Sequence, residues 1–126
     1  MIDYRLGRDE ILWRRIHKDH FIDGRITTAA FKDPEMSVDI ARLRVEMSLT
    51  LADGVGVASF SSGLAYDNGQ VVFSDPVPGN PAHALVIGNK PRSIRKAFCK
   101  ASAFASRESI KPPNSCGSPQ EQGPDQ

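Results

Sequence analysis

Apolar and polar residues alternate along several short stretches of this chain, a pattern that predicts strands with one buried face. The most regular stretch is 43–51, where single polar residues separate Leu43, Val45, Met47, Leu49 and Leu51. Compact runs rich in apolar and β-branched residues predict further strands at 11–16, 25–31, 55–60, 70–74 and 83–87. Turn dipeptides separate some of these runs: Asp23-Gly24, Asp53-Gly54 and Asn68-Gly69.

One long stretch has the period of a helix instead. From Pro91 to about Ser106, apolar residues recur three and four positions apart, at Ile94, Ala97, Phe98, Ala101, Phe104 and Ala105. A shorter helical turn is expected at 61–66, capped by a serine. Residues 33–36 are interpreted as a turn, and 37–42 fit either a strand or a short helix. The pattern therefore predicts an α+β fold, a small and mainly antiparallel sheet with one C-terminal amphipathic helix packed on a face.

Composition divides the chain into a domain and a tail. The chain has 126 residues, 40% of them hydrophobic and 25% charged, as expected for one globular domain. We assign that domain to 1–106, and we expect 107–126, a Pro/Ser/Gln-rich segment with little to bury, to be a disordered tail. Two cysteines, Cys99 and Cys116, are expected to be free thiols. The chain shows no signal peptide and no apolar membrane span, so a cytoplasmic location is expected.

Charge is balanced overall but concentrated after residue 88. The net charge is +1, yet five basic residues and no acidic residue lie between 90 and 100. Cations in the first turn of a helix oppose its dipole, and a bound anion would reverse that repulsion. The sequence thus predicts an anion site at the strand–helix junction 88–96, made by Lys90, Arg92, Ser93, Arg95 and Lys96 with His83 beside it. The alternative is a solvated basic helix face with no ligand.

Other candidate groups are more scattered. His17 and His20 form His-x-x-His, which we interpret as a surface turn rather than a metal site, and no cofactor is predicted. Among the acids, Glu35, Asp39 and Glu46 are candidate general bases, although the sequence pairs none of them with a partner.

Two blocks, Thr27–Asp39 and Asn80–Gly88, are similar to segments of small uncharacterised bacterial proteins, a resemblance that implies no activity. The chain more distantly resembles compact ADP-ribosyltransferase-like folds. In those folds an early strand supplies an arginine or histidine, a later strand a serine or threonine, and a further position a glutamate. The resemblance implies these roles for Arg14, for Thr27 or Thr28, and for Glu46.

Three functional hypotheses follow. The first is a cytosolic bacterial accessory module that recognises an anionic partner, such as a nucleotide, a nucleic-acid backbone or an acidic protein, and not a membrane. The second is a small ADP-ribosyltransferase-like enzyme, and the third is a protein-interaction module that docks a partner on a sheet edge or on the 91–106 helix. A concavity shared by Arg14, His20, His83 and the junction at 88–95 would mark a site, because these groups are far apart in the chain.

Overall fold

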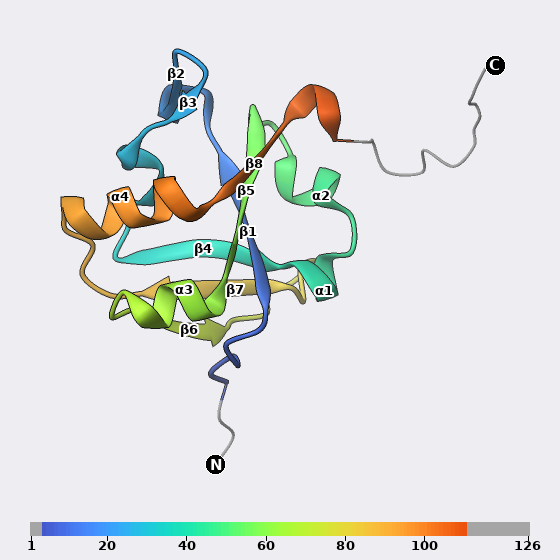
Figure 1. Cartoon of the computed structure of the whole chain (residues 1–126). Helices are drawn as coiled ribbons and strands as arrows, with labels where there is room; N and C mark the ends of the chain where they lie inside the picture. The colour runs from blue at the N-terminus through green and yellow to red at the C-terminus, as the bar shows by residue number, and fades with distance from the viewer. Residues whose placement is uncertain (1–3, 111–126) are drawn as a thin grey trace.

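Six strands form one antiparallel sheet in the computed structural model, which describes residues 4–110 (Figure 1). Their order across the sheet is β6-β7-β4-β1-β5-β8. The strands are β1 (Ile11–Ile16), β4 (Glu35–Ile40), β5 (Gly56–Ser61), β6 (Val71–Ser74), β7 (His83–Ile87) and β8 (Ala103–Ser106). A separate hairpin, β2 (Phe21–Ile22) and β3 (Arg25–Ile26), turns at Asp23-Gly24 as predicted. The mainly antiparallel sheet with helices confirms the α+β class.

Four α-helices accompany the sheet in the described part of the chain, so the prediction of a single helix is wrong. They are α1 (Ala41–Arg44), α2 (Met47–Leu51), α3 (Ser62–Asp67) and α4 (Arg92–Ala101). Helix α3 matches the expected turn at 61–66, and the Ser61 hydroxyl caps it by accepting a hydrogen bond from the Leu64 N–H at 3.1 Å. Short 3-10 helices occur at Lys18–His20, Thr28–Phe31 and Arg107–Ser109.

The strand predicted at 43–51 is also wrong, because this stretch forms α1 and α2. Three of its five alternating apolar residues are exposed rather than buried: Leu43 at 43%, Val45 at 75% and Leu49 at 42%. The two helices are separated at Val45, whose φ of 70° is unusual for a β-branched residue. A strand would bury every second residue of this stretch. Helix α2 instead buries Thr50 and Leu51, which are adjacent in the sequence, so the alternation does not mark a buried sheet face.

Strand β4 occupies residues that were interpreted as a turn and an undecided segment. Its alternation is nevertheless regular, because Met36, Val38 and Ile40 are buried in the main apolar core. Conversely, the strand expected at 25–31 is confirmed only for Arg25–Ile26, and the 3-10 helix at Thr28–Phe31 follows it.

The C-terminal helix is shorter than predicted, and a strand replaces its last turn. Helix α4 ends at Ala101, where Ser102 donates both its N–H and its hydroxyl to the Phe98 carbonyl. The chain then becomes extended and pairs as β8 with β5, and Phe104 stacks on Phe21 with ring centroids 4.7 Å apart. The apolar residues at 104 and 105 therefore serve a strand, although they fit the helical period.

The two faces of the sheet differ in chemistry. Helices α3 and α4 lie over one face (Figure 1), where Phe98 of α4 packs into a core with Phe31, Phe60 and the apolar residues of the central strands. Trp13 pairs in register with Asp39, and Asp39 with His83. Since side chains alternate along a strand, these three side chains share the opposite face. Helix α2 packs against β1 and β5 there.

The start of the expected tail contacts the domain. Arg107 donates its side-chain N–H groups to the carbonyls of Gly54 (2.8 Å) and Ala52, and its backbone N–H bonds to the Val55 carbonyl. Residues 107–110 thus contact the domain, while 111–126, including Cys116, lie outside the described residues, so the predicted disorder of the tail stays a prediction. Cys99 forms no disulfide within residues 4–110. Among residues 4–110 no helix is long and apolar enough to cross a membrane.

Candidate functional site

Strands β1 and β4 diverge, and Arg14 fills the gap between them. Their register covers only Leu12 with Ile40 and Trp13 with Asp39. Beyond that point the Arg14 guanidinium donates to the carbonyls of Ser37 (2.8 Å) and Ala30 (3.1 Å) and pairs with Asp33 at 3.1 Å. Arg14 therefore takes the place of a missing backbone partner. Burial lowers the pKa of its guanidinium, against the attraction of Asp33.

A buried carboxylate, Asp39, joins three segments beside this gap. It accepts hydrogen bonds from the Thr50 hydroxyl of α2 (2.7 Å) and from the Asn80 amide of the loop before β7 (2.8 Å). The Arg44 Nε lies 3.4 Å from the same carboxylate, yet this atom is buried without a hydrogen-bond partner. The neutral donors thus bind both Asp39 oxygens. The neighbouring Arg44 guanidinium donates to the Leu49 carbonyl at 3.3 Å, while its Nε has no hydrogen-bond partner.

His83 has a defined orientation at the start of β7. Its Nδ1 lies 3.0 Å from the Asp75 carbonyl oxygen and 3.1 Å from the Asp75 carboxylate. Both neighbours are acceptors, so Nδ1 carries the proton, and Nε2 is the ring nitrogen left for another contact. Asp75 therefore acts as the orienting partner of His83.

These groups line one cavity of about 500 Å³ on the sheet face opposite α4, which we call the sheet pocket. Residues from β1, β4, β7, α2 and the loops that join them form its wall. The wall comprises Trp13, Arg14, Arg15, His17, His20, Asp33, Ser37, Val38, Asp39, Arg44, Leu49, Thr50, Ala52, Asn80 and His83. Arg14, His20 and His83 are thus brought together from distant parts of the chain, but the junction at 88–95 does not line this pocket.

Two more histidines lie at one end of the sheet pocket. The rings of His17 and His20 are 6.1 Å apart between centroids. Burial lowers the pKa of His20, and the nearby His17, Lys32 and Arg14 lower it further. Within residues 4–110 no group of three or more His, Cys, Asp or Glu side chains is placed to hold a metal ion.

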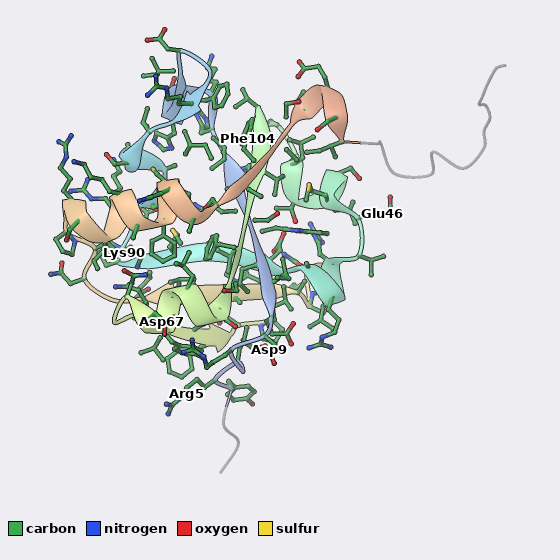
Figure 2. All side chains as sticks on the ribbon, in the orientation of Figure 1. Arg5, Asp9, Glu46, Asp67, Lys90 and Phe104 are labelled. Atoms are coloured by element: carbon green, nitrogen blue, oxygen red, sulfur yellow. The ribbon has the colours of Figure 1, made fainter. Side chains whose placement is uncertain are left out.

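The predicted anion junction is partly closed by its own side chains. Lys90 is 5% exposed, and its ammonium donates to the carbonyls of Pro34 (3.2 Å), Val86 (2.9 Å) and Gly88 (3.2 Å). Burial lowers the pKa of Lys90 to about 8. The Gln70 amide covers the same turn and donates to the Asn89 carbonyl at 2.9 Å. The Lys90 ammonium is therefore engaged inside the fold, near the N-terminal end of α4 in Figure 2.

The other junction residues do not surround Lys90. Arg92, Ser93 and Lys96 are exposed on α4, and Arg95 is half-buried. His83 and the junction lie at opposite ends of the five-residue strand β7, about 13 Å apart along the strand. The structure thus assigns His83 to the sheet pocket and leaves the exposed α4 residues as a separate basic face.

The residues of the transferase-like alternative are also separated. Arg14 lines the sheet pocket, whereas Thr27, Thr28 and Glu46 do not. The Thr27 hydroxyl donates to the His20 carbonyl at 3.3 Å. Glu46 is exposed in the connection between α1 and α2 and points outward in Figure 2. Of the other two candidate general bases, Glu35 is exposed and lies outside the pocket wall, whereas Asp39 is buried in it.

Sequence reasoning missed Trp13, Arg44, Thr50 and Asn80 as site residues. Arg44 and Thr50 belong to the segment interpreted as a strand, so their common approach to Asp39 was hidden. The regular Met36, Val38, Ile40 alternation would have indicated β4 and placed Asp39 on the polar face. The fold and the sheet pocket define an α+β protein with a polar site on one sheet face. No family model, no curated protein and no solved structure matches the chain.

Proposed function

We propose that the protein is a binding module for a ligand with an anionic group, and that the ligand occupies the sheet pocket. The observation that carries the proposal is the composition of the pocket wall, with three arginines and three histidines against two aspartates. Guanidinium and imidazole groups are the side chains best suited to bind phosphate or carboxylate oxygens.

The carboxylates near these cations support the proposal, because they orient the cationic side chains and leave some of their N–H donors available to a ligand. Asp75 and Asp53 hold His83 and Arg15, and neither aspartate lines the pocket. Each oxygen of the Asp39 carboxylate accepts a hydrogen bond from a neutral donor, and the Arg44 Nε lies 3.4 Å from it. Asp33, the other carboxylate of the wall, is paired with Arg14 at 3.1 Å. We assign two groups to contact the ligand: Arg44, and the Nε2 of His83, which donates a hydrogen bond when the imidazole is protonated.

The proposal keeps the anionic ligand expected from the sequence and moves its position. At the 88–96 junction the ammonium of Lys90 already donates three hydrogen bonds, which leaves Arg92, Ser93, Arg95 and Lys96 as a basic face on α4. The sheet pocket is concave and that face belongs to a helix surface, so the sheet pocket is the better candidate.

The test is an NMR titration of the 13.8 kDa protein with inorganic phosphate at low salt and pH 6.5. We expect shifts of amide signals in β1, β4 and β7. The variants His83→Gln and Arg44→Gln should each weaken phosphate binding by about 10-fold, as expected for loss of one charge-assisted contact.

The matched control is the double variant Arg92→Gln/Lys96→Gln, which removes two exposed cations from α4 and leaves the pocket unchanged. We expect it to bind like the wild type. If the control loses binding and the pocket variants keep it, the junction is the anion site. If phosphate shifts no signals at millimolar concentration, the protein has no anion site of this kind.

A further inference from the structure

Trp13 occupies an unusual position for the only tryptophan of the chain. It lies in β1, near the middle of the sheet, in register between Asp39 of β4 and Ser59 of β5. Its side chain is half-buried and belongs to the polar face, outside the main apolar core. A large aromatic side chain placed in the wall of a polar pocket, rather than in the core, presents apolar surface to whatever fills that pocket.

We infer that the anionic ligand carries an aromatic ring, as a nucleoside phosphate does, and that Trp13 is the surface on which the base stacks. This inference rests on the proposed function of the sheet pocket. It assigns the phosphate to the guanidinium and imidazole groups already described and the base to the indole.

The size of the pocket favours such a ligand over a simple anion. A cavity of about 500 Å³ lies within the range of pockets that hold ligands with several rings. Inorganic phosphate would fill a small part of it. Indole–base stacking tolerates any base because each base has a π face, so it supplies affinity without sequence preference.

The wall places basic side chains near Trp13 in two directions, along β1 and across the sheet beyond Asp39. Arg15 is two residues along β1, on the same face, and Asp53 holds its guanidinium at 3.2 Å. On the other side lie Asp39 and then His83, the neighbours across β4 and β7. A ligand stacked on the indole therefore reaches phosphate-binding groups without leaving the pocket.

The test uses the fluorescence of Trp13, which reports on this site alone because the chain has no other tryptophan. Adenosine 5′-monophosphate, ribose 5-phosphate and inorganic phosphate are titrated separately. We expect the nucleotide to quench the fluorescence and to bind at least about 5-fold more tightly than ribose 5-phosphate, which is the lower end of what one stacked base contributes.

Two substitutions of Trp13 separate stacking from folding. Trp13→Leu should abolish the preference for the nucleotide over ribose 5-phosphate, measured by NMR, and leave the weaker binding of ribose 5-phosphate. Trp13→Phe keeps an aromatic face and should retain part of the preference. If NMR shows that Trp13→Leu is unfolded, Trp13→Phe still tests the inference. A preference for the nucleotide over ribose 5-phosphate that is present in the wild type and reduced in Trp13→Phe supports it.

The outcomes distinguish the inference from the proposed function. Equal affinity for the nucleotide and ribose 5-phosphate overturns the base-stacking role and leaves the anion site standing. Absence of binding by all three probes overturns both. A nucleoside phosphate can be a free nucleotide or the 5′ end of a nucleic-acid strand, and a 5′-phosphorylated hexanucleotide distinguishes these two ligands. If the hexanucleotide binds more tightly than the mononucleotide, the ligand is a strand end. If it binds more weakly, the ligand is a free nucleotide.

Discussion

Replacement of Lys90 by methionine tests whether its ammonium is a structural group, as the three carbonyl contacts indicate. Methionine keeps the apolar stem and removes the donor. The Pro34 carbonyl still accepts the Gly88 N–H at 2.9 Å, and Val86 remains paired with Met36 in the sheet, so the loss falls mainly on the carbonyl of Gly88. Because a buried acceptor that loses its donor costs about 1 to 3 kcal/mol, Lys90→Met should lower the free energy of unfolding by about 1 to 3 kcal/mol.

The same substitution has a pH signature. Burial lowers the pKa of Lys90 from 10.5 to about 8 in the folded protein. Below pH 8 the lysine is protonated in both the folded and the unfolded state, so it contributes no pH dependence. Between pH 8 and 10.5 the unfolded chain binds the proton and the folded chain does not, so this group makes the folded state more stable as the pH rises. Lys90→Met lacks this gain, and its deficit relative to the wild type should grow from pH 7.5 to 9.5.

Urea denaturation at several pH values measures both effects. Lys96→Met is the matched control, because Lys96 is exposed on α4, the helix that follows Lys90. The stability of this variant should stay within about 0.5 kcal/mol of the wild type. If Lys90→Met were as stable as this control, the ammonium would contribute nothing inside the fold. If its deficit were the same at pH 7.5 and 9.5, the lowered pKa would be refuted.

Three further predictions concern other parts of the molecule. Gly56→Ala should destabilise the protein by about 2 kcal/mol or more in urea melts, because a Cβ there would collide with the Phe104 ring and with backbone of β8; a wild-type melt would contradict the close packing of β5 and β8. Ser61→Ala should cost about 1 kcal/mol through loss of the α3 cap, and Ser61→Asp, which restores an acceptor, should recover most of it. The lowered pKa of His20 means that the folded state resists its protonation, so stability should fall as the pH drops from 7 to 5; His20→Asn should show a smaller fall, and an NMR pKa at or above 6.5 would be inconsistent with this reasoning.

Local sequence patterns predicted correctly those elements whose own apolar residues form the buried face. The strands at 11–16, 83–87 and, within a residue, 55–60 and 70–74 are confirmed, as is the serine-capped turn at 61–66. The wrong predictions fall in segments whose secondary structure depends on contacts with distant parts of the chain. Residues 43–51 form helices because α2 packs on β1 and β5 through Thr50 and Leu51, and 103–106 form a strand because β5 offers an unpaired edge. Neither partner can be identified from the alternation or the helical period of the segment itself.

The candidate site shows the same division. The sequence pointed to Arg14, Asp39 and His83 as candidate groups and gave them different roles, and it grouped Arg14 and His83 only as a test for a shared concavity. Their convergence depends on the strand order β7-β4-β1, which joins segments that are not consecutive in the chain. Lys90 shows the reverse case. A lysine after a strand looks like a surface cation in the sequence, and only the positions of the Pro34 and Val86 carbonyls show that it turns inward.

The sheet pocket and the fold depend on the same hydrogen bonds. Asp39 holds Thr50 of α2 and Asn80 of the loop before β7, and Arg44 of α1 lies against the same carboxylate. Two walls of the pocket are therefore fixed to the sheet through one buried side chain. A ligand that binds the assembled pocket and not the unfolded chain must stabilise this arrangement, by an amount that grows with the logarithm of its concentration above Kd. Because Trp13 contributes to the wall and not to the Asp39 hydrogen bonds, its substitution separates ligand affinity from the integrity of the pocket, whereas substitution of Asp39 changes both together.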